Sequence, residues 1–101
     1  RSGDWELRAI SAKVISNYKG EDSRVGLLES LKDRNYYVRF NSAFSYIEME
    51  EFERVLDEVN SNMDDPYAKE ITIYAMYSRK MLDYQEYKNM SKRLELEVSV
   101  Q

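Results

Sequence analysis

The chain has 101 residues, enough for one small domain, and its 43% hydrophobic and 34% charged residues are typical of a folded globular domain. It contains no cysteine and no histidine, which excludes thiol nucleophiles, disulfides, histidine general bases and the usual zinc, copper and haem sites. The formal net charge of −4 at pH 7 opposes tight non-specific binding to nucleic acid.

Apolar residues recur at helical spacing along most of the chain, and few glycines or prolines interrupt them, which predicts an all-α domain of about six helices. We expect the first helix at about 5–18, with Gly20 in a left-handed conformation at its C-terminus. Its inner face would consist of residues that recur every three or four positions, namely Leu7, Ser11, Val14 and Tyr18.

The remaining helices are predicted at about 22–32, 36–49, 51–63, 67–82 and 84–94. Asp65 is a suitable cap for the fifth helix, and Pro66 fits its first turn. Beyond this region the apolar residues alternate with polar ones, as in a strand: Leu94, Leu96, Val98 and Val100. We expect this tail to be either a frayed or docked terminus or a short strand that pairs with a partner.

The first and third helices share a sequence pattern. Residues 4–12 align with residues 35–43, a shift of 31 positions, so that the cap type, the aromatic residue, the aliphatic-Arg pair and the Ser-Ala pair coincide. The fifth helix continues the pattern, because Ile71, Ala75, Ser78 and Leu82 take the places of Val38, Ser42, Ser45 and Met49. Units of this kind are helical hairpins that bury a shared face by stacking, which predicts a short α-solenoid of antiparallel hairpins.

The segment from Leu28 to Ala43 resembles a HEAT repeat, with leucines at 28 and 31, Asp33 in the turn and a Val-Arg pair at 38 and 39. A tetratricopeptide array, the rival type of helical hairpin, would keep a steady period of about 34 residues. The resemblance implies a HEAT-like solenoid, a ladder of polar contacts made by Asp33, Arg39 and Arg8, and a ligand-facing side lined by the second helix of each hairpin. We expect residues 1–101 to form a single domain of this type, cut from a longer chain.

No motif for catalysis or metal binding is present. The carboxylates of residues 48–58 lack the calcium-loop spacing, and they fit a solvated helix start better than an acid–base pair. The basic residues between Arg79 and Arg93 form only a short patch in an acidic chain. No apolar run approaches the roughly 18 residues that cross a bilayer. We expect no catalytic residues, metal, cofactor, nucleic acid or membrane span in this segment; the compartment and oligomeric state are not indicated, and the cytoplasm is the default.

The aromatic residues carry the strongest functional signal. A stripe on the third helix is offset from its inward residues, and it has counterparts on the fifth helix. The stripe either packs against neighbouring hairpins or forms a groove for a partner, and we predict a partner surface. Its residues are Tyr37, Phe40, Phe44, Ile73 and Tyr77. The predicted function is a non-catalytic scaffold that binds a protein or peptide; the alternative is a regulatory or substrate-positioning domain attached to an enzyme.

Overall fold

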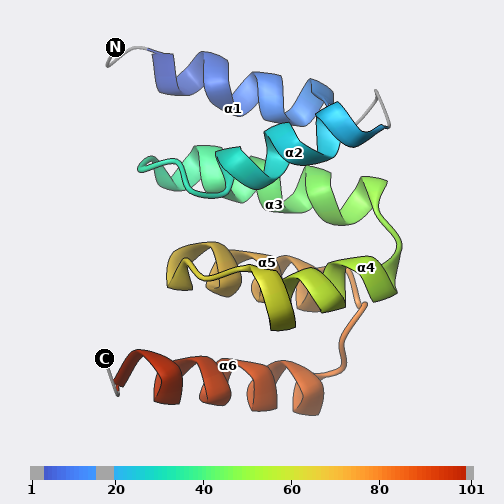
Figure 1. The fold of residues 1–101 in the computed structure, drawn as a ribbon, viewed down its shortest axis with the longest axis vertical. Coiled ribbons are helices and arrows are strands. Elements are labelled where there is room, and N and C mark those ends of the chain that lie inside the picture. The colour runs from blue at the N-terminus through green and yellow to red at the C-terminus, as the bar shows by residue number, and fades with distance from the viewer. Residues whose placement is uncertain (1–3, 16–19, 100–101) are drawn as a thin grey trace.

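The computed structural model describes residues 4–15 and 20–99, and these residues form six α-helices, one π-helical turn and no strand (Figure 1). The elements are α1 (Asp4–Ile15), α2 (Glu21–Ser30), α3 (Tyr36–Met49), α4 (Phe52–Asp57), the π-helical turn η1 (Glu58–Asn62), α5 (Pro66–Ser78) and α6 (Tyr84–Ser99). The prediction of an all-α chain is confirmed for the part of the chain that the structure describes. None of the described helices combines the length and the apolar character needed to cross a membrane.

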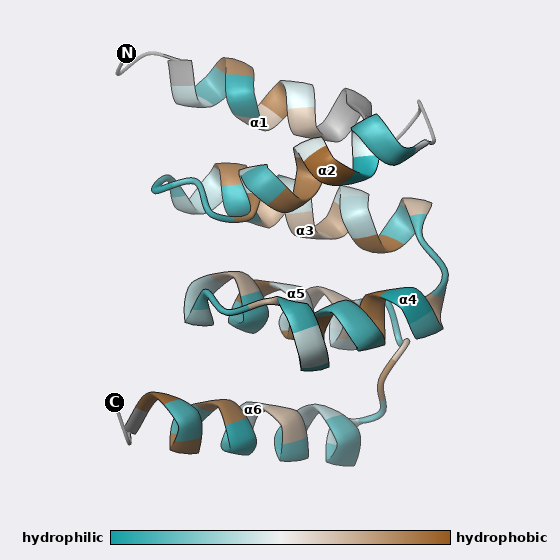
Figure 2. Cartoon of the chain, viewed as in Figure 1, coloured by the Kyte–Doolittle hydropathy of each residue, from teal (hydrophilic) through white to brown (hydrophobic). Residues whose placement is uncertain are grey.

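The helices form a compact bundle in which α3 is central. It packs against α1 on one side and α5 on the other, and α5 in turn packs against α6. Helix α2 lies across α1 and α3, while α4 and η1 lie on the same side of the bundle, next to α5 (Figure 1). Each helix carries both hydrophobic and hydrophilic residues, as expected when one side faces a neighbour and the other faces water (Figure 2).

Side-chain caps define where three of the helices begin. The Oδ1 atom of Asn35 accepts hydrogen bonds from the backbone N–H groups of Tyr37 (2.8 Å) and Val38 (3.3 Å) at the start of α3. Asp65 caps α5 in the same way, and Pro66 is its first residue, as predicted. At α6, Asp83 and Glu86 each accept the other's backbone N–H at 2.8 Å, which is a capping box.

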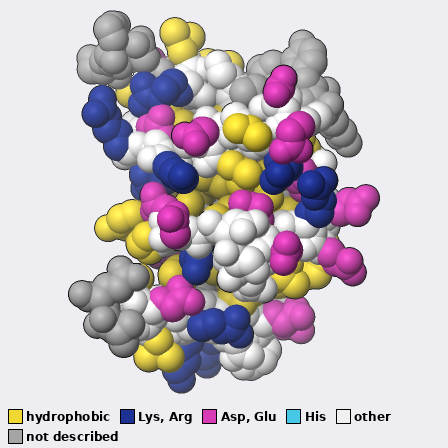
Figure 3. Space-filling model, viewed as in Figure 1, with side chains coloured by type: hydrophobic (Ala, Val, Ile, Leu, Met, Phe, Trp, Pro, Cys, Tyr) yellow, Lys and Arg dark blue, Asp and Glu magenta, His cyan; other side chains and the backbone are white. Residues whose placement is uncertain are grey.

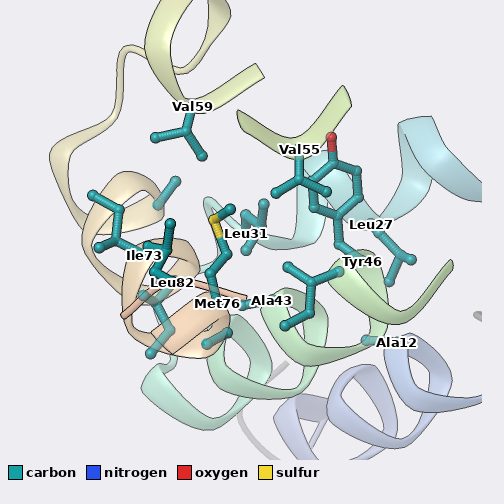
Figure 4. Close-up of a cluster of buried hydrophobic side chains, with 14 residues drawn as sticks. Ala12, Leu27, Leu31, Ala43, Tyr46, Val55, Val59, Ile73, Met76 and Leu82 are labelled. Atoms are coloured by element: carbon teal, nitrogen blue, oxygen red, sulfur yellow. The ribbon is translucent and has the colours of Figure 1, made fainter. Parts of the chain in front are cut away.

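The core lies between α3, α5 and the elements that cover them. Small residues at the helix contacts let the backbones approach closely; Ser42 is fully buried and its hydroxyl donates to the carbonyl of Val38 at 2.6 Å. The buried hydrophobic cluster draws on every helix except α6 (Figure 4). Its labelled members are Ala12, Leu27, Leu31, Ala43, Tyr46, Val55, Val59, Ile73, Met76 and Leu82.

The inner face predicted for the first helix is wrong. Leu7 is 66% exposed and Ser11 is also exposed, whereas Ala9 and Ala12 are buried. The alanines face α3, and Asn41 of α3 donates to the carbonyl of Ala9 at 3.3 Å. Helix α1 lies at the end of the series α1, α3, α5 and α6, so no described helix covers its other side. Tyr18 and the side chain of Val14 lie outside the described residues.

Three helix boundaries also differ from the prediction. Gly20 precedes α2 as its N-cap, with φ 157° and ψ 175°, and it does not adopt the left-handed helical conformation expected after the first helix. The strand-like tail is helical, because α6 continues to Ser99 with Leu96 and Val98 exposed on its surface. Val100 lies outside the described residues.

The third boundary concerns α5, which ends at Ser78, earlier than predicted. Lys80 follows with a left-handed φ of 62°, its N–H donates to the carbonyl of Tyr77, and the N–H of Met81 donates to the carbonyl of Met76 at 2.8 Å. These contacts form a Schellman motif, in which glycine is the usual residue at the position of Lys80.

Candidate binding surface

Asp33, in the turn between α2 and α3, connects this turn to α1. Arg8 of α1 donates to it through two nitrogens, Nε to Oδ2 at 2.5 Å and Nη2 to Oδ1 at 3.0 Å. The Oδ1 atom also accepts the backbone N–H of Asn35 at 2.9 Å. The hydrogen bond from Arg8, followed by that from Asn35, holds the pKa of the Asp33 carboxyl below its usual value against the opposing effect of burial.

Arg39 approaches the same turn from α3. Its Nη1 atom donates to the backbone carbonyl of Asp33 at 2.8 Å. The guanidinium carbon lies 5.8 Å from the ring centroid of Tyr36 and 5.7 Å from that of Tyr67, so one ring from α3 and one from α5 flank it. The contact of Arg39 with this turn that the HEAT resemblance implies is therefore present, through the backbone carbonyl of Asp33.

A groove begins beside Arg39 and runs across α5 to α6. Its middle section is a cavity of about 240 Å³ between α3, α5 and α6, and it continues along the junction of α5 and α6 as a hollow of about 600 Å³. The two sections share Tyr67, Glu70 and Tyr87. We call the whole feature the tyrosine groove, and its lining residues in the middle section are Tyr36, Arg39, Tyr67, Glu70, Ile71, Tyr74 and Tyr87.

Exposed tyrosine rings form much of the tyrosine groove. Tyr36, Tyr67 and Tyr74 are all exposed, Tyr67 to 65%. Tyr36 and Tyr67 follow the capping residues of α3 and α5, which places both rings at helix starts on adjacent helices. Tyr74 lies two turns after Tyr67 and therefore on the same side of α5.

The five residues predicted as a partner surface do not all lie on the surface. Tyr37 is exposed and its ring stacks on Trp5 at 5.7 Å. Phe40 and Phe44 are half-buried, with ring centroids 4.7 Å apart, and both pack against the core.

Tyr77 is half-buried and stacks on Tyr87 of α6 at 4.5 Å. Ile73 is only 3% exposed and belongs to the core, so its prediction as a surface anchor is wrong. The physical reason is the position of α6, because its residue Met90 lines a small cavity together with Ile73 and Val59 of η1.

Sequence reasoning missed the tyrosines of the groove. The spacing of Tyr67, Glu70 and Tyr74, at three and four positions, marks one face of α5 and was a usable signal. No comparable signal existed for Tyr87, because it reaches the groove from a different helix whose packing only the fold determines.

The acidic residues predicted as a solvated surface partly gather around Arg24. Its guanidinium lies 3.0 Å from Glu21, 3.7 Å from Glu50 and 3.6 Å from Glu58, which joins α2 to the α3–α4 turn and to η1. Burial, together with Glu58 and Glu50, raises the pKa of Tyr46 to about 12, so its phenol stays neutral. No group of three or more carboxylates in the described part of the chain is arranged to hold a metal ion.

A second hollow lies on the side of the bundle that carries α2 and η1. It has a volume of about 230 Å³, and its apolar lining includes Val25, Leu28 and Met63. Figure 3 shows hydrophobic side chains in the middle of this face, between charged ones. Charged residues such as Glu29, Lys32 and Glu58 also line this hollow, and none of its described lining residues is aromatic, in contrast to the tyrosine groove.

Comparison with known proteins found no matching family model, no matching curated protein and no matching solved structure.

Proposed function

We propose that this chain is a non-catalytic binding domain that holds an extended segment of a partner protein in the tyrosine groove. The observation that carries the proposal is the continuity of the groove, which runs from Arg39 to α6 and is lined by exposed tyrosines. Tyrosine is enriched at protein interfaces because its ring buries a large apolar area while its hydroxyl still forms hydrogen bonds. An open groove of several connected sections suits an elongated occupant better than a compact small molecule.

The proposal also takes the bundle as a short stack of HEAT-like hairpins, with α1, α3 and α5 as the second helices. Two observations support this arrangement. Helix α3 lies between α1 and α5, and Arg8 and Arg39, which occupy equivalent positions in the sequence pattern, both contact Asp33. The tyrosine groove borders α3 and α5, the helices to which the resemblance assigns the ligand-facing side.

Within this proposal the aromatic residues have different tasks. Tyr36, Tyr67 and Tyr74 contact the partner, because their rings are exposed in the groove. Phe40 and Phe44 support them from behind: Phe40 lies 6.0 Å from Tyr36 and Phe44 lies 6.5 Å from Tyr74, centroid to centroid.

Display of random peptides against the folded chain tests the proposal. Selected peptides are titrated by calorimetry into the wild-type chain and into the double variant Tyr67→Ala, Tyr74→Ala. Each anchor is expected to contribute on the order of 2 kcal/mol, so each single variant should bind about thirtyfold more weakly and the double variant up to about a thousandfold, while the melting temperature changes little.

The matched control is Tyr84→Ala, which removes an exposed tyrosine of α6 that does not line the groove. We expect its affinity to stay within about twofold of wild type. Peptides whose affinity is unchanged in the double variant, or reduced equally by Tyr84→Ala, would place the binding surface elsewhere.

A further inference from the structure

One end of the tyrosine groove opens into a basic hollow. This hollow, of about 370 Å³, lies between the α2–α3 turn and the start of α5. It shares Arg39 and Tyr67 with the middle section of the groove. Its lining residues are Lys32, Asp33, Arg34, Arg39, Asp65 and Tyr67.

The two acids of this hollow are already engaged. Asp33 receives both nitrogens of Arg8 and the backbone N–H of Asn35. Asp65 accepts the backbone N–H groups of Tyr67 and Ala68 as the cap of α5. Asp33 already forms an ion pair with Arg8, so the hollow keeps a surplus of positive charge, with Lys32, Arg34 and Arg39 set against the carboxylate of Asp65.

The cations are available. Lys32 and Arg34 are exposed, and among the described residues neither side chain forms a hydrogen bond or a close ion pair with an acid; Arg34 contributes only a longer-range attraction to Asp33. Arg39 uses one N–H for the carbonyl of Asp33, and its guanidinium lies beside the rings of Tyr36 and Tyr67. A guanidinium held in this way loses little conformational freedom when it binds a carboxylate, whose two oxygens match its planar fork.

The opposite end of the groove has the reverse character. Along the junction of α5 and α6 its lining includes apolar residues and two acids, Glu95 of α6 and Glu70 of α5, which also lines the middle section. An acidic group of a ligand would be repelled there and attracted to the end near Arg39.

We propose that the groove selects an acidic peptide, whose Asp or Glu side chain binds the cations Lys32, Arg34 and Arg39 and whose neighbouring apolar side chains cover Tyr67, Tyr74 and Tyr87. This inference rests on the proposed function and adds the chemistry of the ligand and the place of its acidic residue. That residue lies at the α2–α3 turn and the apolar residues lie toward α6, because the two ends of the groove differ in charge.

A charge-reversal selection tests this inference. Random peptides are displayed against the wild-type chain and, in parallel, against the double variant Lys32→Glu, Arg34→Glu; both residues are exposed, so the variant should fold normally. We expect Asp or Glu at one fixed position among peptides selected on wild type, and Lys or Arg at that position among those selected on the variant. Replacing the acid of a wild-type binder by its amide should weaken binding at least about tenfold at low salt, and less at high salt.

The matched control reverses two exposed cations of α6 outside the groove, in the double variant Lys88→Glu, Lys92→Glu, which has the same net charge. This control should select the same acidic peptides as wild type. Competition experiments with inorganic phosphate and with chloride, at equal ionic strength, separate a peptide site from a general anion site. If phosphate displaces the bound peptide and chloride does not, the assignment to a peptide carboxylate is overturned.

The two proposals fail differently. Selected peptides that need Tyr67 and Tyr74 but show no acidic preference would overturn this inference and leave the binding function in place. Failure to select any peptide that depends on these tyrosines would overturn both.

Discussion

Helices α1 and α3 carry the same sequence pattern but differ in what they bury. Leu7 of α1 and Val38 of α3 occupy equivalent positions, and they are 66% and 0% exposed. Their Ser residues differ in the same way, since Ser42 is buried and Ser11 is exposed. Helix α3 has described neighbours on both sides, whereas α1 has them on one side only. Whether a residue of the repeated pattern is buried therefore depends on how many helices flank its own helix, and not on the residue type.

The strongest way to break this comparison is truncation of the equivalent aliphatic residues. Val38→Ala should lower the free energy of unfolding by about 2–3 kcal/mol, because it removes buried apolar surface and leaves a cavity. Leu7→Ala should change it by less than about 0.5 kcal/mol, because its side chain is mostly in water. Urea denaturation at equilibrium measures both, and equal losses would contradict the difference between the two helices.

Asp33 sharpens the comparison, because it is the shared partner of the equivalent residues Arg8 and Arg39. The hydrogen bond from Arg8 holds the pKa of Asp33 in the folded chain below the ordinary aspartate value of 3.8. Its ionised form therefore stabilises the fold above that pH, and the stabilisation is lost as the pH falls through the lowered folded pKa. We expect Asp33→Asn to lower the free energy of unfolding by about 1–2 kcal/mol at pH 7, and this difference to disappear at strongly acidic pH.

Arg39→Met is the control for this pH dependence. Arg39 donates to the backbone carbonyl of Asp33, which does not titrate, so the loss caused by this variant should be similar at neutral and acidic pH. Urea denaturation of wild type and both variants across the pH range provides the measurement. A loss in Asp33→Asn that stays constant at low pH would show that Arg8 contributes no charge-dependent stability.

The smallest effect concerns α5, the third helix that carries the pattern. Lys80 has a φ of 62°, a conformation that costs a residue with a Cβ atom about 1 kcal/mol. Lys80→Gly should therefore raise the free energy of unfolding by about 0.5–1 kcal/mol. The gain is reduced in part because glycine also increases the conformational entropy of the unfolded chain. Thermal melting detects this gain against Ser78→Gly as the control, which should destabilise because Ser78 is an exposed residue within α5, where glycine lowers helix stability.

The sequence was sufficient for the helical class of the described residues and for where α3 and α5 begin. The caps at Asn35 and Asp65 and the proline at 66 fix where α3 and α5 begin, and these signals are local. The resemblance to a HEAT repeat implied the contact that Arg39 of α3 makes with Asp33 of the preceding turn.

Features that depend on distant neighbours could not be predicted in the same way. Ile73 has the spacing of a surface stripe, yet residues of η1 and α6 surround it. The tail alternates like a strand because Leu96 and Val98 are exposed on α6, where apolar residues need not follow the helical period. The tyrosine groove combines residues from three helices, and only their packing brings Tyr36, Tyr67 and Tyr87 together.

The stacking of Trp5 on Tyr37 has a spectroscopic consequence. Trp5 is the only tryptophan of the chain, and its partner ring lies on α3, so the pair spans the contact between the end helix and the rest of the bundle. Helix α1 has a neighbour on one side only, which makes it a candidate for opening before the whole domain unfolds. Indole emission therefore reports the separation of α1 from α3, whereas far-ultraviolet circular dichroism reports the total helix content. The chain thus contains an intrinsic probe that distinguishes local opening of α1 from global unfolding.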